Sequence, residues 1–317
     1  MQDRTKWLLT AAGVAAAASA GYLLYRRNEN RKNLLTPDDL NLRADLPGDR
    51  IWLQTVDGAS LLVTRSGPPD GPTVVLAHCW TGSRRVWAPV ARRLVRAGCN
   101  VIRWDQRGHG ESSTGSDGNT IANLGRDLAM IVEQLDVRDA VLAGHSMGGM
   151  TALSFATQYP EIFDERIRAL VLVDTAGYGL ANPLSRLAPQ AVRAAWLDRV
   201  ATTPATARSL SRPTFGTWAA EDHLQLMAHD FANTAPRVRE DFAAEFSRMN
   251  MRAAMQRIDK PTAIIVGSMD ILTPARLSRA MHSDIKGSTL QVVAGQGHEG
   301  PLESPALVAN TILSLAR

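Results

Sequence analysis

The residues best suited to chemistry in this sequence lie in the run GHSMGG at residues 144–149. The run follows a buried-strand pattern at Ala140–Ala143 and precedes a helical pattern at Met147–Gln158. A strand that turns sharply into a helix exposes the residue at the turn, and flanking glycines permit the turn and close helix–strand packing. Ser146 is therefore the candidate nucleophile.

The helix after Ser146 adds a second chemical feature. Free backbone N–H groups at a helix N-terminus stabilise negative charge, so we expect the amide of Met147 to bind an oxyanion. A serine hydroxyl is a weak nucleophile unaided, and it needs a base and an acid that orients that base. Both are expected further along the chain.

With this motif, the sequence from about residue 50 to the C-terminus resembles the α/β-hydrolase superfamily, whose chain order is nucleophile, acid, histidine. The resemblance implies that His298, in the loop after the last predicted strand, is the base. It implies that Asp270, after the penultimate strand, is the acid. Asp174 is a rival for the acid, because some members of the family place it one strand earlier.

Two further stretches fit the same resemblance. The run HCWTG at residues 78–82 matches a His-Gly loop that supplies a second oxyanion amide in relatives, and by position the donor here is Trp80. Cys79 replaces the expected glycine, and its simplest interpretation is a small buried side chain. The run DQRGHGES at residues 105–112 is similar to a family stretch whose expected role is structural.

The serine at the turn limits the reaction. Family members that open epoxides or remove halides use aspartate there, because the carboxylate itself forms the alkyl-ester intermediate. The resemblance therefore implies a serine hydrolase of carboxylic esters that requires no cofactor. The alternatives are a carbon–carbon bond hydrolase, a lactonase, a haloperoxidase-like member or a non-catalytic binding module.

The sequence holds no metal or disulfide motif. Its two cysteines, Cys79 and Cys99, form no CxxC pair, and they cannot alone build a disulfide framework or a four-ligand zinc site. No metal is expected.

The elements that must position these residues follow an α/β pattern. Short aliphatic runs alternate with helical patterns, which predicts a mostly parallel sheet with helices on both faces. Asp57-Gly58 predicts an antiparallel hairpin at its start. The predicted strands are Ile51–Val56, Leu61–Arg65, Thr73–Ala77, Asn100–Trp104, Ala140–Ala143, Ala169–Val173, Thr262–Val266 and Leu290–Val293. The predicted helices around the sheet are Val86–Ala97, Ile121–Leu135, Met147–Gln158, Pro274–Met281 and Pro305–Leu315.

A helical insertion interrupts the strand pattern at about residues 177–255, with helices predicted at Ala188–Val200, Thr217–Phe231 and Val238–Met249. Open α/β sheets bind ligands outside the carboxyl ends of their strands, so we expect a cap over the site. The alternative is a packed helical domain away from it. Apolar side chains of the insertion favour a hydrophobic or lipid-like ester. They are Phe215, Trp218, Met227, Phe231, Phe242, Phe246, Met249, Met251 and Met255.

Residues 1–32 differ from the rest of the chain. Residues 7–25 carry no formal charge and as a helix would span roughly 28 Å, which predicts a membrane anchor. A cleaved signal peptide, with export, and a soluble helix are the alternatives. The basic residues after the segment favour a cytoplasmic catalytic domain. Residues 33–49 are interpreted as a polar linker, and residues 50–317 as the hydrolase domain.

The net charge of +4 is concentrated in the same terminal segment. Of 35 basic and 31 acidic residues, residues 1–32 hold six and two. The remaining chain therefore carries 29 of each and is neutral. This balance implies no basic groove for a phosphate backbone, and no nucleic-acid partner is expected.

Overall fold

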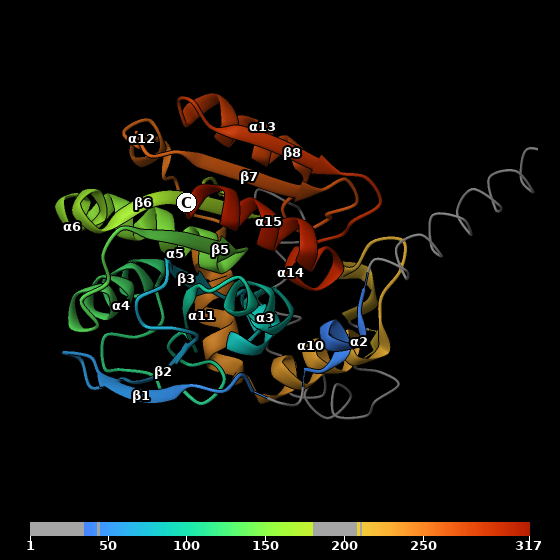
Figure 1. Ribbon diagram of the computed structural model, residues 1–317, viewed down its shortest axis with the longest axis horizontal. Helices are drawn as coiled ribbons and strands as arrows, with labels where there is room; N and C mark the ends of the chain where they lie inside the picture. Colours follow the sequence, from blue (N-terminus) through green and yellow to red (C-terminus); the bar gives the residue numbers. More distant parts are fainter. Residues whose placement is uncertain (1–34, 43–44, 180–207, 210) are drawn as a thin grey trace, which may run out of the picture.

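The structure is a computed structural model that describes residues 35–42, 45–179, 208–209 and 211–317 (Figure 1). Its described strands form one sheet in the order β1-β2-β4-β3-β5-β6-β7-β8. β1 and β4 each pair with β2 in antiparallel fashion, and every other pair is parallel. The predicted α/β class with a mostly parallel sheet is confirmed. The strands are β1 Asp49–Gln54, β2 Ser60–Ser66, β3 Thr73–Ala77, β4 Asn100–Trp104, β5 Ala140–His145, β6 Ile167–Val173, β7 Thr262–Gly267 and β8 Thr289–Val293.

The predicted hairpin opens the sheet. β1 and β2 pair from Asp49 opposite Arg65 to Gln54 opposite Ser60. Gly58 in the turn has a φ of 84°, a left-handed conformation that favours glycine. The Asp-Gly pair therefore predicted the turn correctly, because glycine adopts the positive φ that this turn requires.

Helices cover both faces of the sheet, as predicted. Of the described α-helices in the sheet layers, α6 and α14 were not predicted, because both are too short to show a helical period. The helices of the sheet layers are η1 Arg84–Trp87, α3 Ala88–Arg96, α4 Ile121–Gln134, α5 Met147–Gln158, α6 Pro160–Arg166, α13 Ala275–Asp284, α14 Gly300–Glu303 and α15 Pro305–Leu315.

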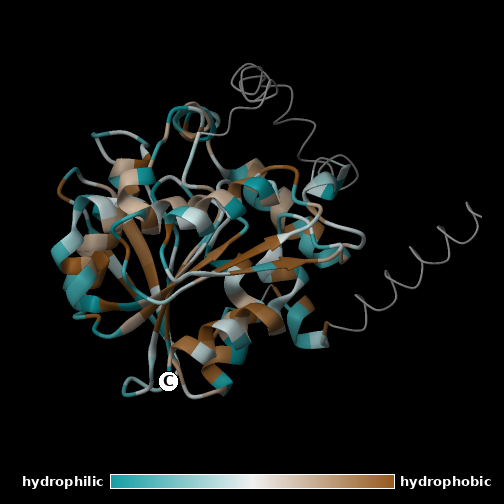
Figure 2. Cartoon of the chain, turned by 90° about the horizontal axis from the view of Figure 1, so that it is seen from above, coloured by the Kyte–Doolittle hydropathy of each residue, from teal (hydrophilic) through white to brown (hydrophobic). Residues whose placement is uncertain are grey.

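Alternation along the strands divides the core into two layers. On β3, Val74 and Leu76 pack with residues of α3 and α15, while Val75 and Ala77 pack with residues of α4 and α5. The inner strands β3, β5, β6 and β7 are consequently mainly apolar and lie in the interior, whereas the edge strands β1 and β8 are largely exposed (Figure 2). Burial on both faces explains the continuous aliphatic runs in the sequence.

The insertion lies between β6 and β7. Its helix predicted at Thr217–Phe231 begins at Glu221, and the one predicted at Val238–Met249 begins at Pro236, since proline is favoured in the first turn of a helix. The helix predicted at Ala188–Val200 lies outside the described residues. The described elements are η2 Arg212–Thr214, α10 Glu221–Asn233, α11 Pro236–Phe246 and α12 Arg252–Met255.

The segment predicted to be a linker contains a short helix, α2 Pro37–Leu40. Asp39 forms an ion pair with Arg93 of α3, and Asp38 pairs with Arg96 of the same helix. The ring of His223 on α10 donates to the carbonyl oxygen of Asp39 at 3.1 Å. The side chains of Asp38 and Asp39 therefore attach this segment to α3, and the backbone carbonyl of Asp39 attaches it to α10.

Within the described part of the chain, none of the helices combines the length and the apolar character that a bilayer crossing needs. A membrane span takes about 20 consecutive apolar residues, whereas α4, the longest described helix, has 14 residues. On this finding the prediction of a membrane-spanning segment, and of a membrane-associated location, is withdrawn. Residues 7–25, on which it was based, lie outside the described residues.

Candidate active site

Ser146 occupies the turn between β5 and α5. Its φ of 52° and ψ of −116° are values that residues with a side chain rarely adopt, so the turn is strained. The Ser146 amide donates to the carbonyl oxygen of Val173 on β6 at 3.0 Å. The amides of Gly149 and Met150 donate to the carbonyl oxygen of Ser146. These bonds hold the strained conformation at the carboxyl edge of the sheet.

The glycines around Ser146 allow α5 to pack directly on the strands. A Cβ atom on Gly148 would lie 2.1 Å from the carbonyl oxygen of Ala77 on β3. A Cβ atom on Gly144 would lie 2.4 Å from the carbonyl oxygen of Gly148. Both contacts are too short for any side chain, which explains the glycines of the motif.

Asp270 and His298 come together from the loops after β7 and β8. Asp270 Oδ2 lies 2.9 Å from His298 Nδ1, and both side chains are buried. Asp270 Oδ1 accepts the amides of Leu272 and Thr273, each at 2.8 Å, and Oδ2 also accepts the Thr273 hydroxyl at 2.7 Å. The carboxylate is thereby fixed in the orientation that meets the imidazole.

The electrostatics of this pair favour charge separation. Burial alone would raise the pKa of Asp270, but the charge of His298 and the hydrogen bonds to the carboxylate lower it to about 2. Burial alone would lower the pKa of His298, and the neighbouring Asp270 carboxylate raises it above the usual 6.5. An ionised Asp270 can therefore stabilise a positive charge on the His298 ring.

Asp174, the rival acid, lies at the end of β6 and is turned to backbone amides. Its Oδ1 accepts the amide of Gly267 at 2.7 Å, and its Oδ2 accepts the amide of Gly300 at 3.0 Å. Burial raises the pKa of Asp174 well above its usual range. Asp174 thus links the loops after β6, β7 and β8, while the His298 ring pairs with Asp270.

The turn at Ser146 touches the His298 loop through its neighbour His145. The His145 Nε2 atom donates to the carbonyl oxygen of His298 at 2.7 Å, and the two rings lie 5.2 Å apart. Among the described residues, no hydrogen bond joins the Ser146 hydroxyl to the His298 ring. The structure thus brings the three predicted residues to one sheet edge, and their joint catalytic role stays a prediction.

The loop at residues 78–82 is held by a buried histidine. His78 Nδ1 donates to the carbonyl oxygen of Cys79 at 2.7 Å, and His78 Nε2 accepts the amide of Gln106 at 2.9 Å. Burial lowers the pKa of His78 to about 4, so the ring is neutral at pH 7. Within the described chain, the amides of Trp80 and Met147 have no hydrogen-bond partner. Their role in binding an oxyanion stays a prediction.

The stretch at residues 105–112 has the structural role expected of it. Asp105 accepts the amide of Arg84 at 2.7 Å and also forms an ion pair with that side chain. Arg107 lies between two buried carboxylates, 2.9 Å from Asp57 and 2.6 Å from Asp127. These contacts attach the stretch to the hairpin, η1 and α4.

Sequence reasoning assigned no role to Glu303, which holds the His298 loop. Its carboxylate accepts the amide of Gly297 at 2.9 Å, the amide of Glu299 at 3.2 Å and the amide of Gly216 at 2.9 Å. A single buried carboxylate therefore joins the insertion to the base loop. Glu303 lies five residues after His298, and this spacing in the sequence does not by itself indicate that Glu303 holds the loop.

The insertion contacts the nucleophile region through apolar side chains. Val238 and Phe242 of α11 pack with Met147 and Met150 of α5. Of the predicted lining, Met255 belongs to the core under the sheet instead. The predicted lining residues in the α11 cluster are Phe242, Phe246, Met249 and Met251, and those in a second cluster beside Cys79 are Phe215 and Met227.

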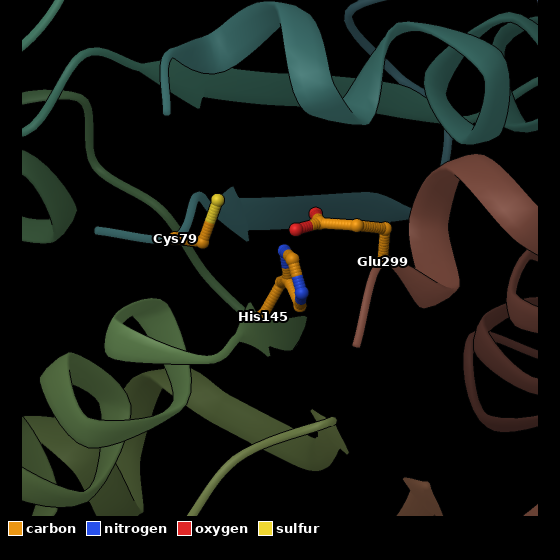
Figure 3. A group of neighbouring side chains, drawn as sticks. All are labelled: Cys79, His145 and Glu299. Carbon is orange, nitrogen blue, oxygen red and sulfur yellow. The ribbon is translucent and has the colours of Figure 1, made fainter. Parts of the chain in front are cut away.

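A group of side chains next to this site has the composition of a metal centre. Cys79, His145 and Glu299 are all buried, and one ligand atom of each lies within 4.8 Å of the others. Burial raises the pKa of both the Cys79 thiol and the Glu299 carboxyl. Figure 3 shows the three side chains pointing toward one another from three different segments.

Comparisons with known proteins identify the family of this chain. A family model described as "alpha/beta hydrolase fold" matches residues 72–305. A protein of Variovorax paradoxus named "Putative carbamate hydrolase RutD" is 31% identical over 262 residues, covering 79% of this chain and 94% of that protein. 3-Oxoadipate enol-lactonase 2 of Acinetobacter baylyi is 30% identical over 208 residues, covering 65% and 74% of the two chains.

A solved structure supports the fold. The esterase EaEST from Exiguobacterium antarcticum superposes with a TM-score of 0.75, covering 84% of this chain and 98% of the esterase. The two sequences are 23% identical, so this likeness concerns the fold alone.

Proposed function

The chain belongs to the α/β-hydrolase fold family and is a hydrolase, and from that premise we propose that it cleaves carboxylic esters with Ser146 as nucleophile. The observation that carries the proposal is the 2.9 Å contact between Asp270 Oδ2 and His298 Nδ1, beside the strained turn of Ser146. A histidine oriented by a buried carboxylate is the base that a serine nucleophile requires.

In the proposed mechanism, Ser146 Oγ attacks the ester carbonyl carbon while His298 Nε2 takes the hydroxyl proton. Asp270 keeps the proton on His298 Nδ1 and stabilises the imidazolium. The amides of Met147 and Trp80 hold the oxyanion. His298 then gives its proton to the leaving alcohol. Water activated by His298 releases the acid and restores Ser146.

The proposed substrate carries a hydrophobic group. Its support is the apolar cluster in which Phe242 of α11 packs with Met147 and Met150, next to the nucleophile. In this proposal the insertion at about residues 177–255 is the cap of a hydrolase domain that spans residues 50–317. A lipid-like ester is the narrower form of the same proposal, and the withdrawn membrane segment no longer supports it.

A lactone is the second candidate substrate. Its support is the 30% identity to 3-oxoadipate enol-lactonase 2, and a lactone is a cyclic ester that the same residues can open. A panel of p-nitrophenyl esters of increasing acyl length, tested beside aliphatic lactones and a dienone-type carbon–carbon substrate, separates the candidates by kcat/KM. The proposal expects the highest values on the esters.

The nucleophile is tested with a fluorophosphonate probe on the full-length protein. We expect an adduct on the peptide that contains Ser146, identified by mass spectrometry. The adduct should be absent from Ser146→Ala and should form far more slowly in His298→Ala. A folded wild-type protein without the adduct, or a His298→Ala variant labelled as fast as wild type, would show that Ser146 is not activated by His298.

A further inference from the structure

Cys79, His145 and Glu299 form a buried cluster, called here the Cys-His-Glu cluster. Their exposed fractions are 2%, 0% and 2%. The His145 ring lies next to the His298 ring, with the two ring centroids 5.2 Å apart. The three residues come from the loop after β3, the end of β5 and the loop after β8. Three strands thus deliver one potential ligand each to the same place (Figure 3).

In the part of the chain that the structure describes, one ring nitrogen of His145 is an acceptor without a hydrogen-bond donor. The His145 Nε2 atom lies 2.7 Å from a carbonyl oxygen, that of His298, so Nε2 carries the proton and donates it. In a neutral ring the other nitrogen, Nδ1, is then an acceptor. Among the described residues Nδ1 has no hydrogen-bond partner, although it is fully buried. The Trp87 ring also lies at 90° to this imidazole, with the two ring centroids 6.4 Å apart.

Glu299 brings a second orphaned acceptor. Its Oε2 atom is buried and also lacks a hydrogen-bond partner within the described chain. Buried polar atoms without a partner are rare in native proteins, because each costs about 1–3 kcal/mol. When Glu299 is ionised, its Oε2 and His145 Nδ1 are both acceptors and cannot satisfy each other, and a cation bound between them would satisfy both.

We propose that the Cys-His-Glu cluster is a binding site for a divalent transition metal of the zinc class. Thiolate, imidazole and carboxylate are the ligands that Zn²⁺ prefers in proteins. The thiolate and the carboxylate together balance the charge of the dication, so the loaded cluster is neutral and suited to burial. The thiol gives its proton to solvent on binding, as thiol ligands do.

The surroundings of the cluster fit this assignment. A tetrahedral zinc ion separates its ligand atoms by roughly 3.5 Å, so atoms within 4.8 Å of one another need to converge by about 1 Å. The His145 Nε2–H bond to a backbone carbonyl is the support that metal-bound histidines commonly have. Gly82 leaves room for the sulfur, because a Cβ atom there would lie 2.7 Å from Cys79 Sγ.

The inference is independent of the proposed esterase activity, since metal binding is measured without substrate. The full-length protein is purified without chelator and its zinc content is determined by plasma mass spectrometry. After removal of metal by dialysis against a chelator, Co²⁺ is titrated and the ultraviolet thiolate-to-cobalt charge-transfer band is followed. We expect stoichiometric metal binding and a band that shows a thiolate ligand.

Matched variants assign the ligands. Cys79→Ser should abolish the charge-transfer band, and Glu299→Gln should weaken Co²⁺ binding by more than roughly 100-fold, beyond what loss of a supporting partner costs. Cys99→Ser removes the other buried cysteine, outside the cluster, and should bind Co²⁺ like wild type. Circular dichroism verifies that each variant is folded.

Two outcomes would overturn the assignment. One is a folded wild-type protein that retains no zinc and develops no charge-transfer band with Co²⁺. The other is a Cys79→Ser variant that keeps the wild-type band, which would place the thiolate ligand elsewhere. If Cys79→Ser does not fold, the affinity of Glu299→Gln decides the question by itself.

Discussion

The carboxylate of Asp174 accepts the amide of Gly267 at 2.7 Å. This bond distinguishes the structural roles of Asp174 and Asp270, the two residues that the sequence offered as the acid. Gly267 ends β7, the strand whose following loop carries Asp270. Asp174 therefore holds the loop that presents the acid and is not itself directed at the imidazole. Mutation of Asp270 should therefore mainly affect activity, and mutation of Asp174 should mainly affect stability.

Asp270→Asn should lower kcat by roughly 10⁴-fold, the loss known for the equivalent change in a serine protease triad, because an amide stabilises the wrong histidine tautomer. Asp174→Asn should mainly lower stability, by about 1–3 kcal/mol, because its amide group cannot accept both backbone N–H groups. Ester hydrolysis per folded molecule and urea unfolding separate the two effects. A larger loss of kcat in Asp174→Asn would make Asp174 the acid.

Ser146→Gly should be more stable than Ser146→Ala by about 1 kcal/mol or more. Both variants remove the hydroxyl, but glycine adopts the positive φ of 52° without the strain that any side chain brings. Thermal unfolding of the two variants measures the difference, and neither should label with a fluorophosphonate. Equal stabilities would mean that the turn stores no strain.

Glu303→Gln should lower kcat through the position of His298. The variant keeps the size of the side chain but replaces one acceptor oxygen with a donor group, next to the amides of Gly297 and Gly216. We expect kcat to fall at least about 10-fold with a smaller change in KM, because the base is misplaced and the cluster around Met147 is intact. Glu161→Gln, at an exposed position, is the matched control.

A merely structural role for Glu303 predicts a different result. In that case the variant would lose stability while kcat per folded molecule stayed at the wild-type value. Active-site titration with the fluorophosphonate counts the competent molecules and decides between the two roles.

Asp57→Asn should destabilise the protein by roughly 3 kcal/mol at pH 7, because it breaks a buried ion pair with Arg107. Burial opposes ionisation of Asp57, but hydrogen bonds from Arg107 and Thr55 hold its pKa well below the usual 3.8. A carboxylate with a depressed pKa stabilises the folded protein above pH 3.8, and this stabilisation is lost as the pH falls further. The difference in the free energy of unfolding between wild type and Asp57→Asn should therefore shrink by about 1.4 kcal/mol per pH unit below pH 3.8.

Urea unfolding at pH 7 and pH 3 measures this difference. Asp70→Asn changes an exposed aspartate of the same region and should show a small difference from wild type at both values. A difference for Asp57→Asn that is the same at both pH values would mean that the Asp57 carboxylate has an ordinary pKa.

Much of this protein could be predicted from local sequence patterns. The inner strands β3, β5, β6 and β7 are recognisable as aliphatic runs because both of their faces are buried. The turn at Ser146 is recognisable because glycine is required where α5 packs closely on the strand backbone. The pair of Gly144 and Gly148 meets that requirement directly. These features depend on neighbours in sequence, so the fold class and the nucleophile candidate were accessible without a structure.

Other features depend on which loops meet in space. Asp174 and Asp270 follow neighbouring strands, and only the hydrogen bonds of the folded loops show which carboxylate faces His298. The boundaries of α10 and the docking of the supposed linker through Asp39 depend on packing partners far along the chain. Periodicity carries no information about such partners.

The sequence by itself thus determined the sheet, the strained serine and the family resemblance, because each is encoded in a short run of residues. Only the tertiary structure brought Cys79, His145 and Glu299 together, since no spacing rule connects three different strand ends. The carboxyl edge of a parallel sheet collects the ends of all its strands, and their order in the sheet decides which side chains meet there.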